Sequence, residues 1–265
     1  MAVRRLTPTL VRVVLGGPGL DGFAMADGTD AYVNLAFAPA GAPYGPVFDP
    51  RAVREQAPRE LWPVRRRYTV RRWDPGSREL TIDFVVHGTS GVAGPWAASA
   101  QVGDALVLEG PAAGYRPDPG AAVHLMLGDE SALPAVAASL EALAPEACAV
   151  VRLVCDGPEH EVPLASPARD VDLVWLHRAG GGAGSQDGEL LAGAARALEL
   201  PPGRVYAFVH GEAEEIRAVR RHLLFERGLA RADMSCSPYW RRTMTDEAWR
   251  EVKRDFVAAM DADVA

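Results

Sequence analysis

The spacing of apolar residues changes near residue 118, and this change constrains the fold more than any other feature. Before it, short strand-like runs are separated by turn residues, which is typical of a small antiparallel barrel. After it, apolar runs alternate with helical segments, which is typical of a parallel sheet covered by helices. Residues 116–120 (RPDPG) have the composition of a linker. We therefore expect a β-barrel domain over residues 1–118 and an α/β domain over residues 119–265.

In the first half, five runs are predicted to be strands because they combine β-branched or aromatic residues with bounding turns. They are residues 10–15, 32–37, 68–73, 79–86 and 105–109, the last ending at Gly110-Pro111. The sequence DPGS at 74–77 predicts a hairpin between the third and fourth runs. Residues 41–63 are rich in proline and glycine, and we expect a long loop there with a short helix over 50–57.

In the second half, strands and helices alternate. The predicted strands are 123–127, 150–155, 171–176 and 205–209, and the predicted helices are 131–143, 188–198 and 212–227. Ligands of such sheets bind at the carboxyl ends of the strands. A last helix is predicted to begin near Thr245, with Trp249, Val252, Phe256 and Met260 on the packed face.

Composition excludes several classes of protein. The 265 residues are 48% hydrophobic with a formal net charge of −7, which argues against a general nucleic-acid binder. The three cysteines (148, 155 and 236) lack metal-ligand spacing, and we predict no metal site. No apolar run approaches the roughly 18–20 residues of a membrane span, and the first 15 residues do not form a convincing signal peptide. We expect a soluble, cytoplasmic monomer.

The stretch Arg67-Tyr68-Thr69-Val70 combines a cation, an aromatic ring and a hydroxyl on one predicted strand. Alternate side chains of a strand share a face, so Arg67 and Thr69 should point one way and Tyr68 and Val70 the other. A flavin dinucleotide needs a cation for its pyrophosphate, a flat surface for its ring and a donor at the ring edge. An ordinary edge strand with solvated arginines is the alternative.

Four further stretches are candidates for functional roles. Residues 83–88 (DFVVHG) end a strand in a histidine and a glycine, although a single histidine there is more often structural. Residues 88–97 (GTSGVAGPWA) form a glycine-rich turn that would let a phosphate approach backbone N–H groups, with a helix starting at Pro95 or Trp96. Residues 127–135 (LGDESALPA) follow a strand and open a helix, as a nucleotide-binding turn does, but lack GxGxxG. Residues 237–242 (SPYWRR) place two aromatic residues and two arginines on a predicted loop, which fits either core packing or ring stacking.

Taken in order, RRYTVR, DFVVHG, GVAGPWA, GDxxxLxGP, GDESALPA, GE and YWRR resemble the siderophore-interacting proteins, a family of FAD-dependent ferric-siderophore reductases. The resemblance runs from Leu6 to the C-terminal helix. It implies the fold of the ferredoxin-reductase-like flavoproteins, with a Greek-key FAD barrel followed by an NAD(P)H-binding α/β domain. GDESALPA has Ser131 where the family usually has threonine.

The resemblance also implies roles for individual residues. Thr69 would hydrogen-bond near flavin N5 and is the predicted catalytic residue, in tuning N5 rather than as a nucleophile. The flavin contacts would be Arg67, Tyr68, Thr69, Val70, Asp83, Val85, His87, Gly91, Val92, Ala93, Gly94 and Trp96. The nicotinamide path would be lined by Gly128, Asp129, Glu130, Ser131, Ala132, Leu133, Gly211 and Glu212, with Tyr239 and Trp240 beside the flavin. Arg178 is a weaker candidate for the 2′-phosphate of NADPH.

In this scheme NADH, NADPH or reduced ferredoxin supplies electrons, and Fe(III) held by a siderophore receives them. The arginines expected to attract an anionic ferric siderophore are Arg65, Arg66, Arg241 and Arg242. The sequence departs from the family at Gly94-Pro95, where an arginine often precedes the tryptophan, and at Thr243, where a glycine is common. These departures leave two alternatives: a flavin- or siderophore-binding protein without turnover, and a related flavin oxidoreductase that serves another redox partner.

Overall fold

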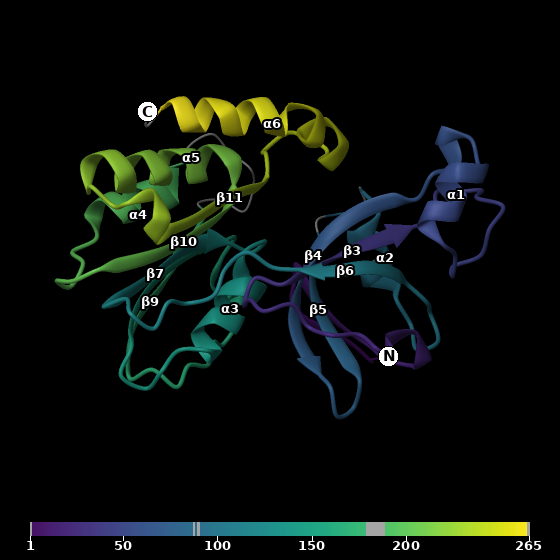
Figure 1. The fold of residues 1–265 in the computed structure, drawn as a ribbon, viewed down its shortest axis with the longest axis horizontal. Coiled ribbons are helices and arrows are strands. Elements are labelled where there is room, and N and C mark those ends of the chain that lie inside the picture. Colours follow the sequence, from purple (N-terminus) through teal and green to yellow (C-terminus); the bar gives the residue numbers. More distant parts are fainter. Residues whose placement is uncertain (1, 87, 89–90, 179–188, 264–265) are drawn as a thin grey trace. The chain divides into compact units, whose positions relative to one another are not determined.

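The computed structural model describes residues 2–86, 88, 91–178 and 189–263, and the chain folds into two compact units, residues 1–114 and 115–265. The elements of both units are labelled in Figure 1. Among the described residues, no helix combines the length and the apolar character that crossing a membrane requires.

The first unit is built on one six-stranded antiparallel sheet with the order β1-β2-β5-β4-β3-β6. Its strands are β1 (Ala2–Thr7), β2 (Leu10–Leu15), β3 (Tyr32–Phe37), β4 (Val64–Asp74), β5 (Glu79–Val85) and β6 (Val107–Ala112). The predicted DPGS turn joins β4 to β5, and Asp74 Oδ1 accepts hydrogen bonds from the N–H groups of Gly76 and Ser77 at 2.9 and 3.2 Å. The antiparallel character predicted for this half is confirmed.

One face of this sheet carries the core of the first unit. Alternate residues of the central strands are fully buried, because each strand turns every second side chain inward. These core residues include Val33, Leu35, Leu80, Ile82 and Phe84. The seven-residue helix α2 (Ala93–Ser99) buries Ala93 and Ala97 in the same core, and α1 (Pro50–Gln56) is the short helix expected in the long loop.

Two strands of the first unit differ from the sequence prediction. β6 does not end at Gly110-Pro111 but continues to Ala112, and its pairing with β3 shifts register between Tyr32 and Asn34. β1 was not predicted because most of its side chains are exposed, so it carries little apolar alternation.

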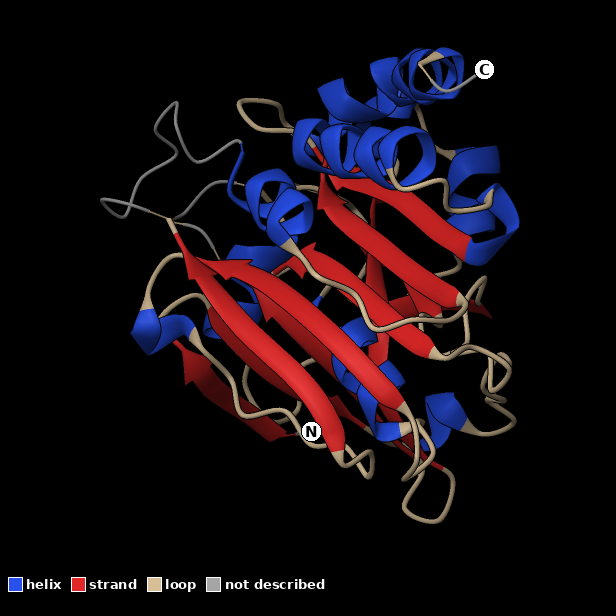
Figure 2. Cartoon of the chain, turned by 90° about the vertical axis from the view of Figure 1, so that its left-hand side faces the viewer, coloured by secondary structure: helices blue, strands red, loops and turns tan. Residues whose placement is uncertain are grey.

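The second unit contains a five-stranded parallel sheet with the order β11-β10-β7-β8-β9 (Figure 2). Its strands are β7 (Val123–Asp129), β8 (Cys148–Cys155), β9 (Asp170–His177), β10 (Val205–Glu212) and β11 (Met234–Trp240). Its helices are α3 (Leu133–Glu141), α4 (Leu190–Ala197), α5 (Ala213–Arg221) and α6 (Asp246–Ala262). Short 3₁₀ turns occur at Pro18–Leu20, Arg59–Leu61, Pro158–His160 and Arg231–Asp233.

Helices cover both faces of the parallel sheet. α4, α5 and α6 lie on one face and α3 on the other (Figure 1). The first face buries Leu125, Leu127 and Val209 against Ile216 of α5 and Trp249 of α6. This layering is what the alternation of strands and helices in the sequence predicts.

Three details of the second unit correct the sequence prediction. Tyr239 and Trp240 lie on strand β11, not on a loop; Pro238 is compatible with that strand because β11 is at the sheet edge. The helix predicted over 212–227 is helical as α5 only to Arg221, and a π-helical turn follows over His222–Glu226. Val252 is 37% exposed and does not belong to the packed face of α6.

Candidate functional site

The carboxyl ends of three parallel strands bring predicted site residues together in the second unit. β7 ends at Asp129, β10 at Glu212 and β11 at Trp240. These strands are neighbours and run in the same direction, so the three residues meet at one edge of the sheet. Ligands of open α/β sheets bind at this edge.

Asp129 is the hub of this edge. Its Oδ2 accepts hydrogen bonds from Trp240 Nε1 at 2.9 Å and from the N–H of Glu212 at 2.8 Å. Its Oδ1 accepts from the N–H and the hydroxyl of Ser131 at 2.9 and 2.5 Å. The carboxylate is only 4% exposed, so it holds the turn in shape rather than serving as a free acid.

Two glycines of the predicted nucleotide site are required by close packing. A Cβ on Gly128 would lie 2.6 Å from the carbonyl oxygen of His210 and 2.7 Å from Ala132 Cβ. Gly211 has φ +149°, and a Cβ there would lie 2.7 Å from Asp129 Oδ2. A side chain at Gly211 would displace the Asp129 carboxylate, and one at Gly128 would clash with the His210 backbone and with Ala132, which explains the glycines in GDESALPA and GE.

Two glutamates connect this edge to helix α5. Glu212 caps the helix by accepting from the N–H groups of Glu214 and Glu215 at 2.9 and 3.1 Å. Glu215 is 3% exposed and accepts from the N–H of Leu191 at 3.0 Å and from Arg242 at 3.1 Å. Burial raises the pKa of Glu215 to about 7, with Asp129 and Glu212 adding to the effect and Arg242 opposing it.

Glu130 and Arg178 form a buried ion pair at the same edge. Arg178 binds both oxygens of Glu130, at 2.5 and 2.9 Å, and also Asp156 at 2.8 Å. Arg178, the weaker candidate for the 2′-phosphate of NADPH, is therefore already held by two carboxylates. Leu133 opens α3, and Leu133 and Ala132 are buried beneath the turn.

In the first unit, the register of β4 confirms the predicted alternation. Thr69 pairs with Tyr32 and Arg67 with Asn34, and the Arg67 guanidinium lies over the Tyr32 ring at 5.5 Å. Tyr68 and Val70 face the core instead, where the Tyr68 ring contacts Phe84 at a centroid distance of 4.4 Å. The face shared by β4 and its neighbour β3 therefore carries the exposed Arg67, the Tyr32 ring and the buried hydroxyl of Thr69.

Other residues predicted to contact the flavin have visible structural partners. Asp83 is buried and forms a bidentate ion pair with Arg12, with two bonds of 2.7 Å. Trp96 packs against Phe37 and Phe84. Val85 is half-buried at the end of β5, and His87 lies outside the described residues.

The glycine-rich turn joins β5 to α2. Gly91 has φ +82°, and nothing lies within 4 Å of where its Cβ would be. Val92 stands at the start of α2, and Gly94 lies against the backbone of Val85. The helix begins at Ala93, earlier than the predicted start at Pro95 or Trp96.

The four arginines predicted to attract substrate are divided between the two units, and three of them have carboxylate partners. Arg65 forms an ion pair with Glu109, and Arg66 lies on the opposite side of the same strand. Arg241 binds Glu214 at 2.6 Å, and Arg242 binds Glu215. The first two lie in one unit and the last two in the other.

Sequence reasoning missed a buried histidine close to this edge. The His210 ring stacks on Phe208 with centroids 3.8 Å apart and meets Tyr239 edge-on at 5.0 Å. Burial lowers the pKa of His210 to about 3, and the charge of Lys253 adds to this effect. Phe208 and His210 alternate on β10 directly before Gly211-Glu212, and this spacing was the available signal.

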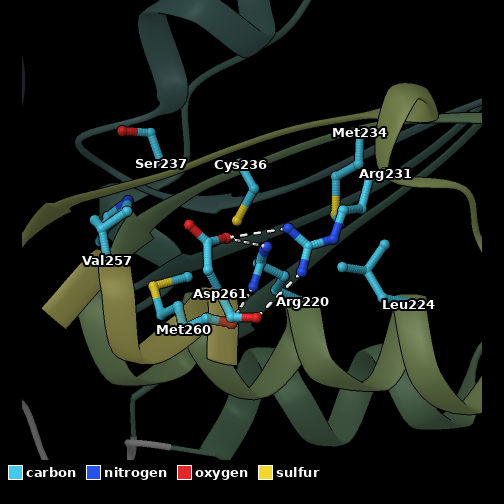
Figure 3. Close-up of a pocket in the computed structure, with 10 residues that line it drawn as sticks. Arg220, Leu224, Arg231, Met234, Cys236, Ser237, Val257, Met260 and Asp261 are labelled. Atoms are coloured by element: carbon cyan, nitrogen blue, oxygen red, sulfur yellow. Dashed lines mark hydrogen bonds and ion pairs between the residues drawn. The ribbon is translucent and has the colours of Figure 1, made fainter. Parts of the chain in front are cut away.

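A cavity of about 340 Å³ lies between β11, α6 and the segment that follows α5 (Figure 3). Arg220 and Arg231 on its wall both bind Asp261 Oδ1, at 2.7 and 3.3 Å. None of the side chains predicted to bind cofactor or substrate lines it. Its charged groups hold the end of α6 in place.

The residues present fit the two nucleotide ligands that the sequence suggests. In the first unit, the exposed Arg67 lies beside the Tyr32 ring, and the buried Thr69 is on the same face of β4, which suits an FAD. In the second unit, the turn between β7 and α3 lies at the carboxyl edge of the sheet, which suits a nicotinamide nucleotide.

Comparison with known proteins gives two family matches. Residues 1–115 match the siderophore-interacting FAD-binding domain, and residues 121–243 match the siderophore-interacting protein.

Individual proteins and structures are also similar to this chain. The ferric vibriobactin reductase of Vibrio cholerae is 35% identical over 93% of this chain and 89% of its own length. An NADPH-dependent ferric-chelate reductase of Escherichia coli is 37% identical over 54% of this chain and 55% of its own length. The structure of a siderophore utilization protein from T. fusca is 38% identical, covers 92% of each chain and has a TM-score of 0.79. The chain therefore belongs to the siderophore-interacting protein family.

Proposed function

We propose that this chain is an FAD-dependent ferric-siderophore reductase that takes electrons from a nicotinamide nucleotide and delivers them to Fe(III). The observation that carries the proposal is the pair of family matches, which together account for both units. A relative named for ferric-siderophore reduction aligns with 93% of the chain. Reduced ferredoxin is the alternative electron donor.

A bound FAD would supply the redox chemistry, accepting a hydride and passing on single electrons. The protein's part is to bind and orient. Fe(II) is held by hard oxygen chelators far less tightly than Fe(III), so reduction releases the metal. No protein acid or base is needed for electron transfer to the iron.

The residues of strand β4 that we propose as flavin contacts have different roles. Arg67 would neutralise the pyrophosphate, because its guanidinium is exposed and faces the same side as Thr69. Thr69 would donate a hydrogen bond near flavin N5. Tyr68 faces the other side of the strand, so its proposed contact with the flavin ring would involve its exposed edge.

The nicotinamide nucleotide would bind at the turn held by Asp129. The backbone between Gly128 and Leu133 would approach its phosphates, and Glu212, Tyr239 and Trp240 would border the site. Asp129 acts there as a positioning residue, because both of its oxygens are bound within the protein.

The substrate would be a ferric siderophore, with Arg65, Arg66, Arg241 and Arg242 as proposed contacts. Three of these arginines pair with glutamates of the chain: Arg65 with Glu109, Arg241 with Glu214 and Arg242 with Glu215. An anionic chelate would compete with those glutamates for the guanidinium groups.

The direct test measures Fe(II) release. FAD-loaded protein is mixed with a ferric siderophore and with NADH, NADPH or reduced ferredoxin, and Fe(II) is trapped by a selective chelator. We expect FAD-dependent Fe(II) formation with at least one donor. If FAD binds but no donor supports reduction of any ferric chelate, the chain is a binding protein and the proposal is wrong.

Variants of strand β4 test the flavin site separately. Arg67→Gln is expected to weaken FAD binding about tenfold or more, because it removes a charge-assisted contact to phosphate. Arg72→Gln is the matched control: Arg72 is on the same strand and largely exposed, and it is not among the predicted flavin contacts. Equal FAD affinities for the two variants would exclude Arg67 from the cofactor site.

A further inference from the structure

The ends of three consecutive parallel strands place two acids around one arginine. Glu130 follows β7, Asp156 follows β8 and Arg178 follows β9. The N–H of Arg178 donates to the carbonyl of Cys155 at 3.0 Å, which fixes its backbone beside the end of β8. The arrangement lies at the sheet edge where the nicotinamide nucleotide is proposed to bind.

The guanidinium of Arg178 is fully engaged with carboxylates. It binds Glu130 with two bonds, at 2.5 and 2.9 Å, in the fork geometry that arginine and carboxylates share. Its third bond, of 2.8 Å, goes to Asp156. The side chains of Arg178 and Glu130 are each 9% exposed, whereas that of Asp156 is 28% exposed. Asp156 is therefore the member of the group that a ligand can reach.

The charge of this group opposes a phosphate. One positive charge faces two negative charges, and Asp129 is close enough to influence both Glu130 and Arg178. A 2′-phosphate carries nearly two negative charges at neutral pH and would meet an excess of like charge. To bind it, Arg178 would have to leave Glu130, which would then be buried without a partner or would have to take up a proton.

A free ribose hydroxyl suits the same group. In dinucleotide-binding folds that carry the GxGxxG turn, an acidic residue downstream of the turn accepts a hydrogen bond from the 2′-hydroxyl of NAD. This chain lacks that turn, but Asp156, directly after the strand that follows the GDESALPA turn, offers the same kind of acceptor at the carboxyl edge of the sheet.

We propose that this chain selects NADH over NADPH: Asp156 accepts a hydrogen bond from the adenosine 2′-hydroxyl, and the Glu130–Arg178 pair excludes a 2′-phosphate. The inference rests on the proposed function for the presence of a nicotinamide nucleotide. It distinguishes this chain from the NADPH-dependent relative, and it makes Asp156 the specificity-determining residue.

The test uses two fragments that differ only in the phosphate. The full-length protein is titrated by calorimetry with 5′-AMP and with adenosine 2′,5′-bisphosphate. We expect 5′-AMP to bind about tenfold tighter or more. The proposal is wrong if the bisphosphate binds as tightly as 5′-AMP or more tightly, or if neither nucleotide binds. This comparison of two affinities uses the natural chain alone.

A variant locates the selectivity. Asp156→Ser is expected to bring the affinity ratio to within about threefold of unity, because it replaces the carboxylate by a neutral hydroxyl and leaves the Glu130–Arg178 pair without excess negative charge. Asp172→Ser is the matched control, since Asp172 lies near the start of β9, at the other end of the strand from Arg178, and binds Arg152. A ratio that stays unchanged in Asp156→Ser would exclude Asp156 as its source.

Flavin reduction separates this inference from the proposed function. With FAD-loaded protein, the rate constant of bleaching should be higher for NADH than for NADPH at equal low concentration. If neither nucleotide bleaches the flavin but 5′-AMP still binds more tightly than the bisphosphate, nicotinamide as the donor is wrong and the adenosine site stands. Faster bleaching by NADPH would refute the selectivity while leaving the reductase proposal intact.

Discussion

Single carboxylates organise the candidate site of the second unit. Asp129 joins the end of β7 to β10 through the Glu212 N–H and to β11 through the Trp240 indole. Because the carboxylate is buried, each of these donors would lose its partner if the side chain were removed, and buried unpaired donors are costly.

Asp129→Ala is expected to lower the free energy of unfolding of the second unit by about 3 kcal/mol. Urea unfolding followed by tryptophan fluorescence measures it. Asp172→Ala, which removes a half-exposed acid paired with Arg152, should change stability by less than about 1 kcal/mol. Equal effects of the two substitutions would mean that Asp129 is not the hub described.

The buried Glu215 predicts a pH dependence. Its pKa in the folded protein is raised to about 7, above the ordinary value of 4.5. The folded state therefore binds this proton more tightly than the unfolded state does. The resulting stabilisation is complete below about pH 4.5 and is lost as the pH rises to about 7, a loss of about 3 kcal/mol.

Glu215→Gln should remove this dependence because glutamine stays neutral. The stability of the variant relative to the natural chain should rise between pH 5 and 7 and stay constant above pH 8. Urea midpoints measured across this range check it. Parallel pH profiles for the two proteins would contradict the raised pKa.

At the scale of elements, the Trp249 side chain joins helix α6 to strand β11. Trp249 is fully buried, packs edge-on against Phe256 at 5.3 Å, and donates from Nε1 to the carbonyl of Tyr239 at 3.1 Å. The same contact thus holds the helix and supports the strand that carries two predicted site residues.

Trp249→Ala is expected to destabilise the second unit by about 3–5 kcal/mol, through lost burial and the cavity that remains. Val252→Ala, on the exposed side of the same helix, should cost less than about 1 kcal/mol. Thermal unfolding of both variants tests the corrected face of α6. If Val252→Ala lowers the free energy of unfolding by more than about 1 kcal/mol, Val252 belongs to the packed face, as the sequence predicted.

Elements were predictable from sequence where one face is buried. β2, β3 and β10 alternate or are continuously apolar, and the capping of α6 by Thr245 was also predicted. β1 and β11 were not predicted as strands because both lie at the edge of a sheet and are incompletely buried. β1 carries two arginines, and β11 contains two serines and a proline. Whether such a segment forms a strand depends on the neighbouring strand with which it pairs rather than on its own sequence pattern.

The candidate site was predictable only in part. The motifs located Asp129, Glu130 and Glu212 at one edge because parallel strands end together. They could not reveal that Arg178 is held by Glu130 and Asp156, since these partners are 48 and 22 positions away in the sequence. They also could not separate Asp83 as the partner of Arg12 from a flavin contact.

At the scale of the whole molecule, two units with different sheets divide the proposed reaction. In the proposal, the antiparallel unit would provide the face of β4 for the flavin, and the parallel unit would provide the edge around Asp129 for the nucleotide. The proposed reduction requires both units in the same chain, and both match the same family.

One anaerobic absorbance experiment tests the central claim most directly. The purified protein, loaded with FAD, should show the bands of oxidised flavin, lose them on addition of NADH and regain them on addition of a ferric siderophore. About two Fe(III) should be consumed for each flavin, because a hydride carries two electrons. A protein that refuses FAD, or a reduced flavin that ferric siderophore does not reoxidise, would contradict the account.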